Sequence, residues 1–175
     1  LMPELPETTD SRHRQLPEPD WQRRFVYPAM ATLFEIVLPL TADREARAIA
    51  QTAFDEVDRL ENQLSRHRPG SDVARVNEAP PGVPVPVGPE LMAVLVLTRQ
   101  IREETGGAFS ITAGAMQPGQ PEPSDPLAID ETTYTVSRRT GTAQIDLGAV
   151  GKGFAVDAVA DLLPDYGVAS ALVHA

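Results

Sequence analysis

The 175-residue chain contains no cysteine, which excludes disulfide bonds, thiolate metal ligands and a thiol nucleophile. It also contains no apolar run long enough to cross a bilayer. Its 15 Lys and Arg residues are outnumbered by 25 Asp and Glu residues, and the formal net charge is -10. The densest basic cluster, Arg66-His67-Arg68, is short, so the sequence argues against binding to a nucleic-acid backbone.

The length of 175 residues suits one hydrophobic core and is too short for two ordinary domains. An apolar content of 42% and a charged content of 23% are typical of a globular protein. No secretory signal peptide is visible and no cysteine could form a lipobox within this sequence, and we leave the compartment open because the natural start is expected to lie upstream of Leu1.

Lysine is nearly absent, since Lys152 is the single lysine of the chain. It lies in the stretch Asp146–Asp157, where Gly148, Gly151 and Gly153 lead into a predicted amphipathic helix. Glycines let a ligand approach the main chain closely, and the first turn of a helix has amide donors without partners. The stretch therefore predicts an anion-binding turn with Lys152 as a ligand. The alternative is a solubilising charge at the start of a helix.

Two familiar phosphate-binding motifs do not fit this stretch. A Walker loop requires glycine five residues before its Gly-Lys pair and Ser or Thr after the pair, but these positions hold Asp146 and Gly153. A dinucleotide fingerprint requires Gly-x-Gly-x-x-Gly, whereas the order here is Gly-x-x-Gly-x-Gly. The anion site is therefore of another kind.

The chain begins with a region of low apolar content. Residues 1–24 hold four prolines and mixed charges, which predicts an unstructured tail or linker. Residues 32–38 are rich in β-branched and aromatic side chains and predict a strand. A helix capped by Thr41 or Asp43 is then expected to run to about Ser65, because its apolar residues recur at helical spacing.

The remaining elements are predicted by turn residues and periodicity. They are a helical turn over 71–77, a loop over 78–88, a helix from Pro89 to Gly106, a turn into 108–112, a loop over 117–126, a hairpin of 134–136 with 142–147, a helix over about 152–163 and a strand over 170–175. The mixture predicts an α+β domain built of mixed α/β layers. Because the last strand stops at the chain end and would leave a bare sheet edge, we expect the sequence to be a fragment.

The stretch Asp146–Asp157 resembles the motif Asp-Leu-Gly-Gly-Ile-x-Lys-Gly-Tyr-x-x-Asp of the ApbE family, the FAD:protein FMN transferases. Met30-Ala31-Thr32 resembles the family's Met-Gly-Thr, and Leu64–Asn77 resembles Leu-Ser-x-Tyr-x-x-x-Ser-Glu-x-x-x-x-Asn. Residues 105–114 resemble Thr-Gly-Gly-x-Phe-Asp-x-Thr-x-Gly. The four motifs occur in the family's order, so residues 25–175 are interpreted as the N-terminal and central part of such a domain.

The resemblance implies a set of FAD-binding residues, which are Met30, His67, Ala108, Phe109, Ser110, Asp146 and Lys152. It also implies that the backbone carbonyl of Ala149 is a ligand of Mg²⁺, a cation that prefers oxygen ligands. His67 stands where the family usually has Tyr, and Ser110 stands where it has Asp. The family's remaining metal ligands and its candidate base lie near the C-terminal end, so catalytic residues are expected beyond Ala175.

Several of these residues have a simpler interpretation when taken alone. Met30 would be a core side chain, His67 an exposed loop residue, and Gly106-Gly107 the end of a helix. For the whole domain, the resemblance implies helices packed on mostly antiparallel sheet, with the C-terminal part missing. It implies Mg²⁺-dependent transfer of FMN from FAD to a threonine of an acceptor flavoprotein, with release of AMP. A non-catalytic FAD-binding protein and an FAD pyrophosphatase are the alternatives.

Overall fold

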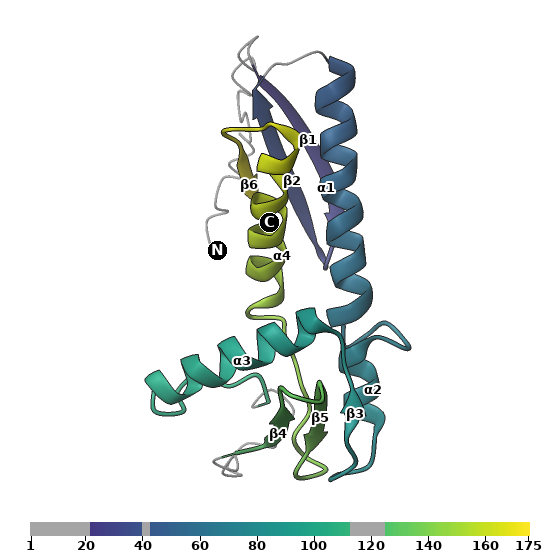
Figure 1. Cartoon of the computed structure of the whole chain (residues 1–175), viewed down its shortest axis with the longest axis vertical. Coiled ribbons are helices and arrows are strands. Elements are labelled where there is room, and N and C mark those ends of the chain that lie inside the picture. Colours follow the sequence, from purple (N-terminus) through teal and green to yellow (C-terminus); the bar gives the residue numbers. More distant parts are fainter. Residues whose placement is uncertain (1–21, 40–42, 113–124) are drawn as a thin grey trace, which may run out of the picture.

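The computed structural model describes residues 22–39, 43–112 and 125–175. The described strands form two three-stranded sheets, one in the upper and one in the lower half of Figure 1, each accompanied by helices. Every pairing in both sheets is antiparallel. The expected α+β fold with helices on antiparallel sheet is therefore confirmed.

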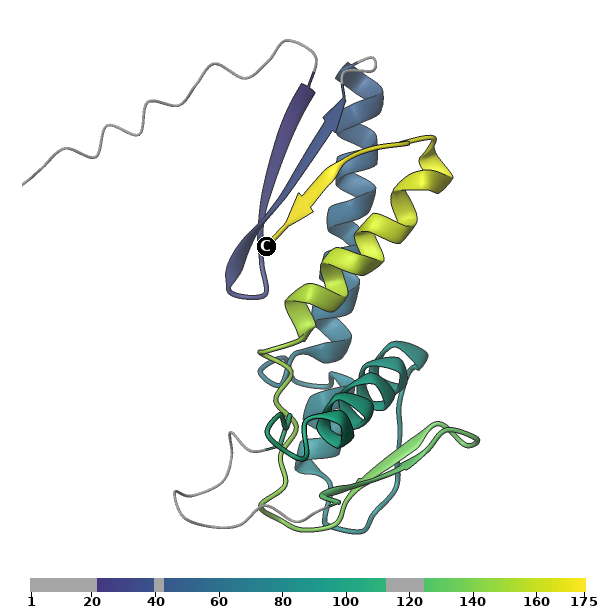
Figure 2. The same ribbon diagram turned by 90° about the vertical axis from the view of Figure 1, so that its left-hand side faces the viewer.

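The upper sheet has the strand order β1 (Gln22–Ala29), β2 (Thr32–Pro39) and β6 (Leu172–His174). Figure 2 shows two helices, α1 and α4, on the same side of this sheet. Alternate β2 side chains face these helices and are almost completely buried, namely Phe34, Ile36 and Leu38. The strands predicted over 32–38 and 170–175 are confirmed, while β1 begins inside the region 1–24 that was predicted to be unstructured.

Helix α1 (Asp43–Leu64) is held to the sheet by one apolar stripe. Eight side chains at helical spacing are buried along it: Ala46, Ile49, Ala50, Ala53, Phe54, Val57, Leu60 and Leu64. Helix α4 (Gly151–Leu162) lies beside α1 and continues into the 3₁₀ turn η2 (Leu163–Tyr166), close to its predicted range. The predicted cap at Thr41 or Asp43 lies outside the described side chains. None of the described helices is long and apolar enough to cross a membrane.

The lower half begins with helix α2 (Asp72–Glu78), which is capped by the Ser71 hydroxyl as expected. Helix α3 (Pro89–Glu104) carries proline in its first turn and buries Leu91, Val94, Leu95 and Thr98. The small sheet has the order β3 (Val85–Pro86), β5 (Thr135–Arg138) and β4 (Leu127–Asp130). The helices predicted over 71–77 and from Pro89 are therefore confirmed.

The predicted hairpin of 134–136 with 142–147 is wrong. Strand β5 pairs instead with β4, which precedes it, through a turn over 131–134. Asp130 forms this turn, because its carboxylate accepts hydrogen bonds from the N–H groups of Thr132 and Thr133 at 2.9 and 3.1 Å. These bonds lower the pKa of Asp130. Residues 142–147 form no strand and leave the small sheet toward the other half.

A buried arginine joins α2 to the loop after β5. The side chain of Arg138 is 6% exposed and donates to the carbonyl oxygens of Val76 at 3.0 Å and Ala79 at 2.5 Å, near the end of α2. It also donates to the carbonyl oxygens of Gly141 and Ala143, at 3.1 and 3.3 Å. A buried charge needs such partners, and carbonyls near a helix C-terminus favour a cation.

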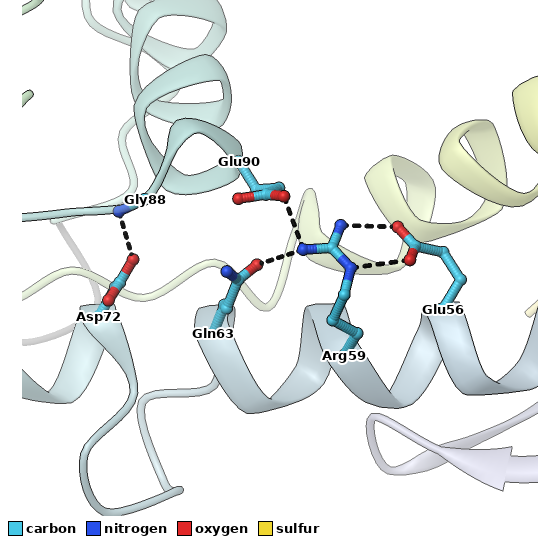
Figure 3. Close-up of polar contacts among 6 residues, drawn as sticks. All are labelled: Glu56, Arg59, Gln63, Asp72, Gly88 and Glu90. Carbon is cyan, nitrogen blue, oxygen red and sulfur yellow. Dashed lines mark hydrogen bonds and ion pairs between the residues drawn. The ribbon is translucent and has the colours of Figure 1, made fainter.

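Two separate sets of polar contacts connect α3 and the chain entering it to α1 and α2 (Figure 3). Arg59 of α1 contacts Glu56 through two nitrogens at 2.7 Å and reaches Glu90 in the first turn of α3 at 2.6 Å. The bonds to Glu56 are the largest influence and raise the pKa of Arg59, against an opposing effect of burial. Asp72 of α2 accepts from the N–H of Gly88 at 2.6 Å, which secures the chain entering α3.

The turn between β1 and β2 is strained. Ala29 pairs with Thr32, so only Met30 and Ala31 form the turn, and both have positive φ angles, 48° and 58°. A type I′ turn of this kind normally uses Asn or Gly. Left-handed backbone costs a non-glycine residue about 1–2 kcal/mol, of which the more flexible unfolded state of a glycine variant cancels about 0.4–1 kcal/mol.

We expect Ala31→Gly to raise the free energy of unfolding by about 0.5–1 kcal/mol, measured by urea denaturation. Ala79→Gly is the matched control, because Ala79 has a φ of -63° and no strain to relieve. The control should lose stability. A loss of stability in Ala31→Gly as well would show that the turn is not strained.

Glu35 on β2 holds the last strand in place. Its carboxylate is buried in the sheet face, pairs with Arg24 on β1, and lies 3.1 Å from the ring nitrogen Nε2 of His174 on β6. Burial by itself raises the pKa of Glu35, but the hydrogen bonds from Arg24 and His174 outweigh it, and the net pKa is lowered. Ionised Glu35 therefore stabilises the fold above the unfolded pKa of 4.5, and this contribution disappears as the pH falls through the lower folded pKa.

We expect the stability difference between the wild type and Glu35→Gln to be largest above pH 5 and to shrink as the pH falls from about 4.5 toward 3. Chemical denaturation at a series of pH values measures it. Glu78→Gln, at an exposed position without an ion pair among the described residues, serves as the control and should stay parallel to the wild type. Parallel curves for Glu35→Gln would contradict the assignment.

Candidate functional site

Three segments that are distant in sequence meet around a cavity of about 340 Å³. The segments are the β1–β2 turn, the loop after α1 and the glycine-rich turn before α4. Met30, His67, Asp146 and Lys152 all line this cavity. Four of the seven predicted flavin-binding residues are therefore brought together.

The glycine-rich turn opens the start of α4. The N–H groups of Val150 and Gly151 both donate to the carbonyl oxygen of Leu147, at 3.0 and 2.7 Å, which folds the turn tightly. No side chain caps the helix at Val150. Among the described residues, no acceptor is found for the N–H groups of Lys152 and Gly153, so this end of α4 has donors available for an anion.

Lys152 is an exposed cation at this turn. Its Nζ donates to the carbonyl oxygen of Gly148 at 3.2 Å, and no carboxylate in the described part of the chain pairs with it. An ammonium group has three donors, so two remain for a ligand. These donors lie at the turn where the sequence predicts an anion ligand.

Asp146 is oriented by the same turn. Its Oδ1 accepts from the N–H of Gly148 at 2.9 Å, and its Oδ2 lies 3.1 Å from NH1 of Arg66. A Cβ added at Gly148 would meet Oδ1 at 3.2 Å, so glycine gives the carboxylate the space that it occupies. The carboxylate at the cavity is therefore held from both sides.

The Leu64–Asn77 motif builds the loop that carries His67. Ser71 donates to the carbonyl oxygen of Ser65 at 2.5 Å while capping α2, which closes the loop. The Ser65 hydroxyl then accepts from the N–H of His67 at 3.2 Å. The ring of His67 is exposed, and its Nε2 accepts from Nε of Arg66 at 3.1 Å.

The last residue of that motif connects it to the glycine-rich turn. The side-chain amide of Asn77 donates to the carbonyl oxygen of Ile145 at 2.9 Å and accepts from its N–H at 2.8 Å. Ile145 directly precedes Asp146, whose own N–H donates to the carbonyl oxygen of Ile111 at 2.7 Å. Asn77 thus positions Asp146 without reaching the cavity.

The position of Met30 is compatible with a core side chain and with a residue of the flavin site. Its side chain is half-buried and packs against the hydrophobic core, and it also lines the cavity from the strained β1–β2 turn. A thioether adapts readily to irregular surfaces, so a methionine can serve the core and a ring system at once.

Ala108, Phe109 and Ser110 do not join this cavity. Ser110 lines a different one, of about 620 Å³, between α3 and β4, whereas Ala108 and Phe109 line neither. The main-chain bond from Asp146 to Ile111 nevertheless connects their loop to the glycine-rich turn. Ser110 stands where the family has aspartate, and its hydroxyl oxygen lies 3.1 Å from the hydroxyl oxygen of Thr112.

Ala149 is an exposed residue, and its backbone carbonyl accepts no hydrogen bond from the described residues. It can act as one oxygen ligand of a hard cation. Among the described residues, however, no group of three or more His, Asp or Glu side chains could hold a metal ion. One carbonyl oxygen is not a complete set of ligands for a metal ion.

Arg66, Arg68 and Glu61 also line the cavity and were not predicted as site residues. Arg68 is paired with Glu61 at 2.6 Å and with Asn62 at 2.6 Å, whereas Arg66 faces Asp146. The only sequence signal for the two arginines is the short basic cluster, whose positions the family pattern leaves unspecified.

The profile of the ApbE family matches residues 30–175. The chain is 29% identical over 154 residues to the FAD:protein FMN transferase of Treponema pallidum, covering 74% of this chain and 42% of that protein. It is 26% identical over 172 residues to the FAD:protein FMN transferase of Klebsiella pneumoniae, covering 87% and 54%. The chain thus spans about half the length of these relatives.

Solved structures show the same fold. The flavin transferase ApbE from Vibrio cholerae superimposes with a TM-score of 0.76 at 20% identity, covering 87% of this chain and 56% of that one. The apo flavinyl transferase ApbE from Pseudomonas stutzeri gives 0.74 at 24% identity, covering 88% and 56%. The arrangement of helices and sheets described above is therefore shared with these proteins.

The bonds of Asn77 yield a prediction about the site. Asn77→Ala leaves the N–H and carbonyl of Ile145 without their partner, and we expect a loss of about 2–3 kcal/mol in the free energy of unfolding, measured by urea denaturation. Gln100→Ala, which removes an exposed side chain on α3, is the control and should cost less than about 0.5 kcal/mol. Equal effects of the two substitutions would show that Asn77 does not support the turn.

Proposed function

The chain belongs to the ApbE family, and on that premise we propose that it forms the flavin-binding part of an FAD:protein FMN transferase. The observation that supports this most is the convergence of Met30, His67, Asp146 and Lys152 on one cavity. These residues come from three separate motifs, and their meeting has no explanation in packing alone, because His67 and Lys152 are exposed.

The phosphates of the nucleotide would lie at the start of α4. Lys152 and the free amides of the first helical turn all favour negative charge there. The chain as a whole carries a net charge of -10, so a local site for an anion has to be built from such groups. Lys152 would bind one phosphate and orient the pyrophosphate along the turn.

A ring of the nucleotide would lie beside Met30 and His67. Both side chains line the cavity together with the apolar Leu64 and Leu147. An imidazole can stack on a flavin or adenine ring, although it covers less area than the tyrosine usual in the family. Asp146, held by Gly148 and Arg66, would accept hydrogen bonds from the nucleotide.

The proposed reaction is a phosphoryl transfer. The hydroxyl oxygen of an acceptor threonine forms a bond to the phosphorus of the FMN half, and the bond from that phosphorus to the bridging oxygen breaks. AMP leaves with the bridging oxygen, and the hydroxyl proton passes to a base that lies outside the residues assigned here. Within this chain, Lys152 would neutralise charge on the phosphates, and the cavity would hold the nucleotide in place.

Mg²⁺ would supply further charge neutralisation in the whole enzyme. The described residues offer it the carbonyl of Ala149 but not a full set of ligands. We therefore assign no step of the reaction to the metal in this chain.

The test combines binding with transfer. FAD fluorescence quenching is measured with and without Mg²⁺ on the 175-residue chain and on the product of the complete gene. The gene product is then incubated with FAD, Mg²⁺ and an acceptor flavoprotein, and covalent flavin is detected by in-gel fluorescence. Covalent labelling that disappears when the acceptor threonine is replaced by alanine supports the transferase. Release of FMN and AMP without labelling would indicate a pyrophosphatase, and binding without any reaction a flavin-binding protein.

We expect Lys152→Met to weaken FAD binding by about 10- to 150-fold, because it removes a charge-assisted contact worth about 1.5–3 kcal/mol. Arg47→Met removes a positive charge from an exposed position on α1 and should leave the affinity within about twofold, since surface charges beyond a Debye length are screened. Unchanged affinity in Lys152→Met would refute the anion site.

A further inference from the structure

Arg66 holds the two polar sides of the cavity together. Its NH1 lies 3.1 Å from Oδ2 of Asp146, and its Nε donates to Nε2 of His67 at 3.1 Å. Its side chain is 42% exposed, and these contacts use only part of the five N–H donors of a guanidinium. No further partner of Arg66 is found within the described ranges, so donors remain available at the cavity.

Arg66 and Lys152 both converge on Gly148. Lys152 donates to the carbonyl oxygen of Gly148, while Arg66 pairs with the carboxylate that accepts from the N–H of the same glycine. The two cations are therefore connected to the same residue of the glycine-rich turn, Lys152 directly through its carbonyl and Arg66 indirectly through Asp146 and its N–H. This places Arg66 beside the proposed phosphate position, although it comes from a different motif.

The charges around the cavity do not balance. Arg66, Arg68 and Lys152 line it together with only two carboxylates, those of Glu61 and Asp146. Arg68 and Glu61 pair with each other at 2.6 Å, which leaves Arg66 and Lys152 with Asp146 alone. One positive charge is in excess here, in a protein whose formal net charge is -10.

We propose that Arg66 is a second phosphate-binding residue, which holds the pyrophosphate of the flavin nucleotide together with Lys152; this rests on the function proposed above. A guanidinium presents parallel N–H donors that match two phosphate oxygens, a geometry that an ammonium group lacks. The donors that Asp146 and His67 leave unused are the ones offered to the phosphate, so Arg66 still holds Asp146 when the nucleotide binds.

A purely structural Arg66 would behave differently. If it only joined the His67 loop to Asp146, its removal would weaken FAD binding by the same factor at every salt concentration. A contact to phosphate is electrostatic, so its loss reduces both the affinity and the dependence of that affinity on salt. Salt dependence therefore separates the two roles.

The experiment measures the Kd for FAD at 50 and 300 mM KCl for the wild type, Arg66→Gln and Arg66→Lys of the full-length protein. We expect Arg66→Gln to weaken binding by about 10- to 150-fold at low salt and clearly less at high salt. Arg66→Lys should recover part of the affinity, because it restores the charge without the planar fork. Thermal melts show whether each variant folds. If one of the two variants does not fold, the salt dependence of the other is compared with that of the wild type.

Arg47→Gln is the matched control, because it makes the same change of charge on α1 about 20 Å along the helix from the cavity, and it should match the wild type at both salts. An equal loss at both salts, or no loss, in Arg66→Gln would overturn the proposal while leaving the flavin-binding function intact. Absence of FAD binding by the wild type would overturn both.

Discussion

The site depends on one side chain that takes the place of a strand partner. Asn77 binds both main-chain groups of Ile145, so the segment leading to Asp146 is fixed although it belongs to neither sheet. This segment connects the small sheet to α4, and its direction decides where the glycine-rich turn lies. Arg138 supports the same arrangement from the other end of the loop, through its bonds to the carbonyls of Gly141 and Ala143.

These contacts explain why the motif around Leu64–Asn77 is long. Ser71 closes the loop, Ser65 orients the main chain of His67, and Asn77 secures the glycine-rich turn. Ser65 and His67 line the cavity, whereas Ser71 and Asn77 do not. The first five residues of the motif, 64–68, therefore line the cavity, and its later residues hold the loop and the glycine-rich turn in position.

The cavity also shows how an acidic protein presents a site for an anion. Arg68 is engaged by Glu61 and Asn62, whereas Lys152 and part of Arg66 keep free donors beside the amides at the start of α4. The excess of negative charge elsewhere lies on the surface, where salt screens it over a distance of about 8–10 Å. Local geometry, more than the net charge, therefore controls what this cavity can bind.

The sequence alone determined the helices, the strand β2, the Ser71 cap and the family motifs, because periodicity, capping and glycine spacing are local properties. The sequence predicted the wrong hairpin, because the alternating pattern over 142–147 is typical of a strand. In the structure the main chain of Ile145 instead bonds the side chain of Asn77, which lies 68 positions earlier. Only the tertiary structure decided that β5 pairs with β4, that Ser110 lies at another cavity than Lys152, and that Arg66 faces Asp146. Each of these depends on contacts between distant segments, whose free energy comes from packing and pairing that no local pattern encodes.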